Sequence, residues 1–343
     1  MPVDSIPIEK AFKLKSGALL SAKKMIRGPY PVYGGNGNNG YHNDFKFEEP
    51  KLIIGRVGAY CGNVHLTAKN SWITDNALYI SELYEEYDLN YLLYVLREAN
   101  LGQYRSQAGQ PLISAGRLAT IQIPLPPLDE QKRIAAILDK ADALRRKQQK
   151  ALDLCDEFLK ATFIDMFGDP ITNSKGWATK KFQDIVKLQR GHDLPKNKRN
   201  SQGSIPVYGS NGILSNHNES KCVEGIVTGR SGSIGNVYYS KEPFWPLNTT
   251  LFSIETYDNN LMYLSHLLSH FKLERFSRGA GVPTLNRNLF HSELIYDIDI
   301  NIQSKFAEIA KKTEAQKSKL QQSLDQLNEN FNALSQRAFK GEL

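Results

Sequence analysis

The sequence predicts an α+β protein in which two similar mixed α/β modules are each followed by a long helix. The two helices are expected to form an antiparallel coiled coil, so that the whole chain is a pseudo-twofold duplication. Three observations predict this class: a repeat about half the chain long, an alternation of two sequence textures, and a matching apolar seam in the two helical stretches.

A series of short motifs occurs twice, in the same order. Residues 31–37 (PVYGGNG) return at 206–212 (PVYGSNG), residues 54–58 at 228–232, residues 62–64 at 235–237, Trp72 as Trp245, and residues 108–111 at 280–283. The offset falls only from 175 to 172 residues. Solenoid units are roughly 20–50 residues long. This repeat is therefore a duplicated domain.

The two copies share a texture that is rich in Gly, Asn, Tyr and Pro. We call residues 1–127 module 1 and residues 167–302 module 2. Short apolar runs bounded by turn residues predict strands. The strands are expected at 51–54, 77–80 and 225–228, with helices at 89–100 and 261–276.

The stretches 128–166 and 303–343 are rich in helix formers and predict one long helix each. Prolines precede the first stretch and Gly168 and Pro170 follow it, as expected at helix boundaries. The second carries an apolar seam with steps of 4, 3, 4, 3 and 4: Leu320, Leu324, Leu327, Phe331, Leu334, Ala338. The positions 172 earlier form a weaker seam: Gln148, Leu152, Cys155, Leu159, Thr162, Met166. A coiled-coil seam needs a partner, and each helix is the obvious partner of the other.

The bulk composition is that of a globular protein. The 343 residues are 41% hydrophobic and 23% charged, and no apolar run approaches the roughly 18 residues of a membrane span. The N-terminus shows no signal-peptide pattern. The three cysteines are odd in number and widely spaced, which favours neither a disulfide framework nor a zinc site. We expect a reducing, cytoplasmic setting.

The known signatures of catalysis and cofactor binding are missing from the sequence. It has no phosphate-binding loop, dinucleotide fingerprint, zinc-protease motif or nucleophile elbow. His266 and His270 lie four residues apart on an expected helix, but no third metal ligand is suggested. We therefore expect a protein that is not an enzyme and that holds no cofactor or metal.

The order of parts and three local motifs resemble the specificity (S) subunit of type I restriction-modification systems. The motifs are PPLDEQKRIA at 126–135, FIDMFGDP at 163–170 and SQRAFKGEL at 335–343. The resemblance implies that each module is a target recognition domain reading one half of a bipartite, asymmetric DNA sequence. It also implies that the helices set the gap and dock methyltransferase subunits, two in number, and that a motor-endonuclease subunit completes the complex.

Two alternatives stay open at this level. The chain could be a coiled-coil scaffold with two protein-binding heads and no specific DNA binding. It could also have diverged from a related nuclease-methylase, although it carries no site for a nucleotide, metal or methyl donor. The net charge of +7 agrees with a polyanion partner without requiring one.

Base reading needs side chains that make paired hydrogen bonds, such as Arg with guanine and Asn or Gln with adenine. The candidates in module 1 are Asn36, Arg56, Tyr60, Arg105, Gln107 and Gln110. Those in module 2 are Lys196, Lys198, Arg199, Ser210, Asn211, Arg230, Ser231, Ser233, Arg278, Asn286 and Arg287. Two different half-sites need unshared contacts, so segments 57–61 and 106–110 and their counterparts 231–234 and 277–281 are the expected specificity loops.

Several candidates have a plainer explanation. The repeated Tyr-Gly-x-Asn-Gly pattern suits a tight turn, so it is either scaffold or a DNA-facing loop. Arg56 and Arg230 contact phosphate or act as structural hydrogen-bond hubs. The basic stretch that contains Lys196 and Lys198 is either a solvated loop or a phosphate contact. Trp72 and Trp245 are expected in the core.

Overall fold

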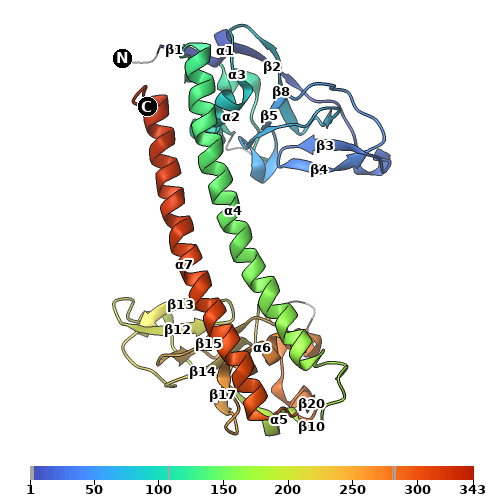
Figure 1. The fold of residues 1–343 in the computed structure, drawn as a ribbon, viewed down its shortest axis with the longest axis vertical. Coiled ribbons are helices and arrows are strands. Elements are labelled where there is room, and N and C mark those ends of the chain that lie inside the picture. Colours follow the sequence, from blue (N-terminus) through green and yellow to red (C-terminus); the bar gives the residue numbers. More distant parts are fainter. Residues whose placement is uncertain (1–3, 107–108, 280, 282) are drawn as a thin grey trace. The chain divides into compact units, whose positions relative to one another are not determined.

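The computed structural model describes residues 4–106, 109–279, 281 and 283–343. The chain divides into two compact units, residues 1–149 with 322–343 (unit 1) and residues 150–321 (unit 2). Module 1 lies in unit 1 and module 2 in unit 2. The two long helices, α4 (Leu128–Phe167) and α7 (Ile300–Phe339), each contribute one part to both units (Figure 1).

Unit 1 contains a four-stranded sheet of order β2-β8-β5-β6, a three-stranded sheet β4-β3-β7 and the pair β1-β9. The strands are β1 Ser5–Pro7, β2 Phe12–Ser16, β3 Tyr30–Gly34, β4 Gly37–His42, β5 Leu52–Gly55, β6 Val64–Leu66, β7 Trp72–Ile73, β8 Ala77–Leu83 and β9 Gln122–Pro124. The helices are α1 Ile8–Ala11, α2 Leu89–Glu98 and α3 Ala115–Leu118, with 3-10 turns η1 Ala22–Lys24, η2 Gly58–Tyr60 and η3 Leu101–Tyr104.

Unit 2 repeats this plan with sheets β11-β17-β14-β15 and β13-β12-β16 and the pairs β10-β20 and β18-β19. The strands are β10 Thr179–Lys181, β11 Lys187–Arg190, β12 Ile205–Gly209, β13 Gly212–His217, β14 Gly225–Gly229, β15 Val237–Ser240, β16 Trp245–Pro246, β17 Thr250–Glu255, β18 Ser277–Arg278, β19 Thr284–Leu285 and β20 Leu294–Tyr296. The helices are α5 Phe182–Ile185 and α6 Leu261–Phe271, with 3-10 turns η4 Lys196–Lys198, η5 Leu273–Phe276 and η6 Arg287–Leu289.

The predicted duplication is confirmed down to the strand register. The parallel pair Val32–Trp72 of β3 and β7 recurs as Val207–Trp245 of β12 and β16. The β3–β4 hairpin has a register shift between Val32 and Tyr33, and the β12–β13 hairpin has one at the equivalent place, between Val207 and Tyr208. Because a register slip of one residue turns every side chain to the other face, two matching registers mean that the two cores are built to one plan.

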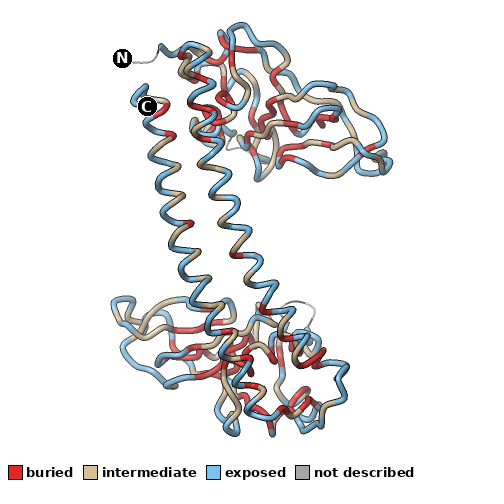
Figure 2. Tube along the Cα trace, in the orientation of Figure 1, coloured by how far each residue is buried: buried red, intermediate tan, exposed pale blue. Residues whose placement is uncertain are grey.

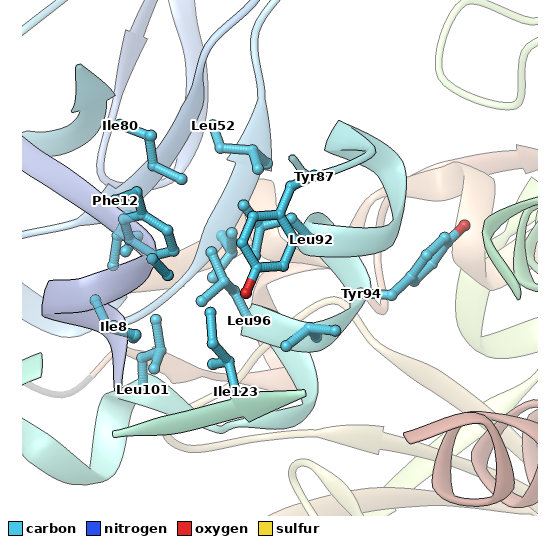
Figure 3. Packing of buried hydrophobic residues seen from close by; sticks show 14 of the residues in the cluster. Ile8, Phe12, Leu52, Ile80, Tyr87, Leu92, Tyr94, Leu96, Leu101 and Ile123 are labelled. Atoms are coloured by element: carbon cyan, nitrogen blue, oxygen red, sulfur yellow. The ribbon is translucent and has the colours of Figure 1, made fainter. Parts of the chain in front are cut away.

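The core of module 1 forms where α2 packs against the sheet (Figure 3). Asp88 begins the helix, since its carboxylate accepts hydrogen bonds from the backbone N–H groups of Asn90 and Tyr91. Leu92 and Leu96, one turn apart, are both fully buried. Buried residues gather inside each module and thin out along the long helices (Figure 2).

Both long helices complete the core of each unit. In unit 1, Ile134 and Leu138 of α4 join the module core, and Phe331 and Phe339 of α7 pack against it. In unit 2, Phe163 and Phe167 of α4 meet Phe306 of α7, and all three are fully buried. The predicted seam residue Phe331 thus also contacts its module, with its ring centroid 6.0 Å from that of Tyr94.

The antiparallel direction of the helix pair is confirmed by contacts inside each unit. In unit 1, the Arg133 guanidinium donates to the carbonyl of Leu343, and Arg145 Nε donates to Asn328 Oδ1 at 2.8 Å. Residue numbers rise along α4 while they fall along α7. In unit 2, Asp156 pairs with Lys317, whereas Phe163, further along α4, packs against Phe306. Among the described residues, none of the helices has the length and apolarity to cross a bilayer.

Candidate nucleic-acid interface

Three segments meet at one edge of module 1. The β3–β4 turn lies against the segment after β5, because a Cβ on Gly35 would be 3.5 Å from Gly55 Cα and 3.7 Å from the Val57 carbonyl oxygen. The third segment, 105–112, joins through the N–H of Gly58, which donates to the carbonyl of Pro111 at 2.9 Å. We call the described residues of these three segments, 34–37, 56–60 and 105–106 with 109–112, loop cluster 1.

Cys61 ties two segments of loop cluster 1 together. Its Sγ donates to the carbonyls of Arg56 and Pro111, each at 3.1 Å. Burial raises the pKa of the Cys61 thiol, against smaller opposing effects of a backbone hydrogen bond with Ile113 and of the charge of Arg105. The protonated thiol therefore keeps its donor role, so this buried cysteine is structural.

Module 2 brings the equivalent segments together as loop cluster 2, the described residues 209–212, 230–233 and 277–279 with 281 and 283–285. Ser210 lies beside the segment after β14, since its Oγ is 3.6 Å from the position of a Cβ on Gly232. The N–H of Gly232 donates to the carbonyl of Pro283 at 3.1 Å. In this module the third segment forms a short hairpin, with Ser277 opposite Leu285 and Arg278 opposite Thr284.

The two repeated arginines hold structural hydrogen bonds. Arg56 Nη1 donates to Ser16 Oγ at 3.1 Å and to the carbonyl of Asp75 at 3.4 Å. Arg230 Nη1 donates to the carbonyl of Asn248 at 3.3 Å. Both side chains are half-buried, so they anchor the loop clusters, and a contact with DNA stays a prediction for them.

Most of the predicted reading residues lie on or beside the two loop clusters. The exposed ones are Asn36, Tyr60, Arg105, Gln110, Asn211, Arg278 and Asn286, and the half-buried ones are Ser210, Ser231 and Ser233. Gln107 lies outside the described residues. Asn286 also caps η6, because its side chain accepts from the N–H of Asn288. Arg287 turns inward, where its Nη1 donates to the carbonyl of Leu188 at 3.4 Å.

The predicted turns and core tryptophans are confirmed. Gly37 and Gly212, which close the two hairpins, have φ values of 89° and 96°, a region that glycine adopts without strain. Trp72 and Trp245 are 9% and 7% exposed.

The basic segment of module 2 lies beside loop cluster 2. Lys196 and Lys198 are exposed on η4, whereas Arg199 is half-buried and its Nε donates to the carbonyl of Leu194 at 3.2 Å. Asn248 links the two regions, since its carbonyl accepts from Arg230 and its amide donates to Asp193. Lys196 and Lys198 are therefore free to meet a phosphate, and Arg199 supports the loop that carries them.

A polar hollow of about 1080 Å³ lies next to loop cluster 1. Its polar side chains come from β6, α2 and η3 and from the residues beside these elements: Asn63, His65, Arg97, Asn100, Gln103, Arg105 and Ser106. No acidic side chain lines it among the described residues. Arg97 is held across the end of β6, where its Nε donates to the carbonyl of Val64 at 3.1 Å.

Sequence reasoning named only Arg105 of these residues. It missed Arg97, Asn63 and Gln103 because they lie outside the loops that differ most visibly between the modules. One signal was present: at an offset of 172, Arg97, Gly102 and Arg105 correspond to Ser269, Glu274 and Ser277.

The histidine pair of module 2 is part of the core. Burial, helped by the charge of His270, lowers the pKa of His266 to about 4. The His270 ring stacks on Phe163 with centroids 4.4 Å apart. Within the described part of the chain, no group of three or more His, Cys, Asp or Glu side chains could hold a metal ion.

Comparison with known proteins identifies the family. The family model described as "Type I restriction modification DNA specificity domain" matches residues 5–153 and again residues 174–329. The chain belongs to this family and contains its domain twice.

Individual relatives agree. The chain is 34% identical over 137 residues to the type I restriction enzyme EcoprrI specificity subunit of Escherichia coli, across 38% of this chain and 34% of the relative. It is 23% identical over 276 residues to a putative type I specificity subunit of Mycoplasma pneumoniae, across 75% of this chain and 74% of that protein. The chain thus spans about a third of the length of the first relative.

Solved structures share the fold over nearly the whole chain. The type I restriction-modification S subunit from M. genitalium superimposes with a TM-score of 0.68 at 18% identity, over 98% of this chain and 96% of that chain. A chain from a study of complex assembly and conformational transition of the type I system gives 0.55 at 11% identity, over 100% and 98%. The predicted fold class is therefore confirmed.

Proposed function

We infer that this chain is the DNA-binding specificity subunit of a type I restriction-modification complex and acts in the cytoplasm. Residues 1–127 and 167–302 are the two target recognition domains, and each reads one half of a bipartite, asymmetric DNA sequence. Residues 128–166 and 303–343 are the spacer helices that set the gap. One observation carries this proposal: the family's DNA specificity domain occurs twice, on one strand plan with different loop residues.

The loop clusters are the proposed DNA-facing surfaces. Their shared residues build turns and anchor loops, as Gly37 and Arg56 do, whereas their unshared residues are exposed side chains able to hydrogen-bond base edges. Tyr60 in loop cluster 1 is 50% exposed, and the sequence of module 2 places Ser233 and Ile234 in that region. Lys196 and Lys198 would add phosphate contacts, which supply affinity without sequence information.

The spacer helices are the proposed docking sites for two methyltransferase subunits, with a motor-endonuclease subunit joining the full complex. On α4, Leu154 and Phe158 lie one turn apart and are 51% and 52% exposed. Such an apolar pair on a helix fits a partner helix. Replacing both with Glu should abolish co-purification of the methyltransferase, whereas Val223→Glu, at a residue 76% exposed in module 2, should not. Equal retention of the methyltransferase by both variants would rule out this docking site.

The test of the proposed function is to co-express the chain with its neighbouring methyltransferase and to map the methylated positions across a genome. A two-part motif with a fixed gap is the expected result. Exchanging residues 1–127 for another recognition domain should change one half of the motif and leave the other half and the gap unaltered. Absence of a motif, together with duplex binding that ignores sequence and salt, would favour the protein-binding scaffold instead.

A further inference from the structure

The polar hollow beside loop cluster 1 can be compared with the same place in module 2, because the two modules share one strand plan. Residues 100–104 of module 1 and residues 272–276 of module 2 follow the same backbone course. Asn100 and Lys272 both have left-handed backbone conformations, with φ of 44° and 56°, and each precedes a four-residue 3-10 turn, η3 or η5. The two places are therefore comparable positions of the repeat, although their side chains and the neighbouring loops differ.

The lining residues differ between the modules in both directions. At the same offset of 172, Asn100, Gln103 and Ser106 correspond to the basic residues Lys272, Arg275 and Arg278, whereas three other positions lose positive charge or gain a negative one. Arg97 and Arg105 of module 1 are replaced by Ser269 and Ser277 in module 2, and Gly102 is replaced by Glu274. The Glu274 side chain folds over Gly235, where its Oε2 would be 2.8 Å from a Cβ on that glycine. In module 1 a Cβ on the equivalent Gly62 would instead be 2.2 Å from the backbone nitrogen of Gly102, so no carboxylate lies at this place.

The charge of the hollow points to an anion. Two guanidinium groups line it, together with the amide side chains of Asn63 and Gln103. The carboxylate of Asp142 on α4 acts on Arg97, but it is already in salt bridges with Arg145 and Arg146. His65 also lines the hollow, and its buried Nε2 has no hydrogen-bond partner in the structure.

The concave shape of the site favours contact with the sugar-phosphate backbone of DNA over contact with base edges. A base edge lies at the floor of a groove and is reached by a protruding side chain, whereas the sugar-phosphate backbone is a ridge that a hollow can receive. Guanidinium groups hold phosphate oxygens through paired, charge-assisted hydrogen bonds.

We propose that this hollow is a DNA phosphate-binding site of module 1, formed by Arg97 and Arg105 around Gly102, and that module 2 has a carboxylate, Glu274, at the same place. This inference rests on the proposed DNA-binding function and adds the place and the residues of a backbone contact.

The test measures binding of the full-length chain to a random-sequence duplex as a function of salt. Gly102→Glu introduces the carboxylate of module 2 into the hollow, and Gly102→Gln is its uncharged control. Both bring a Cβ 3.1 Å from the Cys61 carbonyl oxygen, so they carry the same strain. Gly116→Glu makes the same charge change outside the hollow, at a position with open space around it.

We expect Gly102→Glu to weaken binding roughly tenfold relative to Gly102→Gln, because the new carboxylate repels phosphate and pairs with the arginines. Arg97→Gln and Arg105→Gln should each reduce the slope of log affinity against log salt by about 0.9, the change expected when the protein neutralises one phosphate fewer. Glu274→Gln should not lower affinity, since it removes a negative charge. Gly116→Glu should stay close to wild type.

Three outcomes would overturn the assignment. Equal affinities of Gly102→Glu and Gly102→Gln would show that the hollow meets no anion. An effect confined to particular DNA sequences would mean that the hollow reads bases. A wild-type chain that binds duplexes without salt dependence would overturn both this inference and the proposed function, whereas the first two outcomes leave DNA binding itself intact.

Discussion

At the scale of single residues, one buried glutamine in each unit holds the module to a long helix. Gln131 on α4 is 1% exposed, and its Nε2 donates to the carbonyls of Glu86 and Pro126 while its Oε1 accepts from the N–H of Asp88. In unit 2, Gln303 on α7 is also 1% exposed and accepts from the N–H of Asn260 at 2.9 Å. Asp88 and Asn260 are the N-caps of α2 and α6, so each glutamine fixes the start of its module's main helix.

Gln131→Leu should therefore destabilise unit 1 strongly. The change leaves buried backbone groups without a partner, at a cost of about 1–3 kcal/mol for each group. Urea unfolding followed by fluorescence and circular dichroism would measure the loss. Gln122→Leu, at an exposed position of β9, is the matched control and should change stability by less than about 0.5 kcal/mol. Equal effects of the two changes would contradict the role assigned to Gln131.

The pKa of His266 gives a pH dependence with a definite sign. The pKa of His266 in the folded state is lowered to about 4 from the ordinary 6.5. Between these two pH values the unfolded chain therefore binds a proton at His266 and the folded chain does not. The stabilising contribution is present above pH 6.5 and is lost progressively as pH falls towards 4. His266→Gln should make the unfolding free energy less dependent on pH in this window. An unchanged pH dependence in the variant would refute the prediction.

At the scale of elements, an aromatic contact joins the two long helices within the core of unit 2. The Phe306 ring lies 5.4 Å from Phe163 and 5.5 Å from Phe167, centroid to centroid. Phe306→Ala should lower the unfolding free energy by about 3–5 kcal/mol, as for other buried phenylalanines. Phe158→Ala on α4, where the side chain is 52% exposed, provides the control in a chemical-unfolding experiment. A small effect of Phe306→Ala would mean that the helices are held by other contacts.

Prediction from sequence succeeds for elements whose signal is local. The expected helices at 89–100 and 261–276 are confirmed as α2 and α6, and the expected strands at 51–54, 77–80 and 225–228 as β5, β8 and β14. The seam of α7 was also readable. The residues that this seam contacts could not be predicted. The Arg145 guanidinium carbon lies 4.3 Å from the centroid of the Phe331 ring, and Tyr94 of the module lies beside the same ring. Periodicity identifies an apolar face but not the surface that covers it.

The candidate site was predictable only in part, for a related reason. Tyr60 and Arg105 stood out because they sit in loops that differ between the modules. Arg97 lies on a helix, five residues before a glycine that is glutamate in the other module, and its place in a hollow depends on how α2 meets β6. Contacts between distant segments carry this information, and a single sequence does not show them.

At the scale of the whole molecule, the proposed ruler makes a quantitative prediction. Inserting one heptad into both helices, after Gln149 and after Gln321, keeps the seam in phase and lengthens each helix by roughly 10 Å. The gap in the methylated motif should then grow by about 3 base pairs at 3.4 Å each. Insertion into α4 alone is the control, because it puts the two seams out of register and should abolish modification. An unchanged gap after the double insertion would rule out the ruler.

The C-terminal part of α7 belongs to unit 1, and this affects the order in which the two modules can fold during synthesis. The core of module 1 includes Ala338 and is packed by Phe331 and Phe339, which come more than half the chain later than the strands they cover. Contacts of such long sequence separation form late and slow folding. On the ribosome, the first module to be synthesised is therefore the last to be completed, and the second module closes before it.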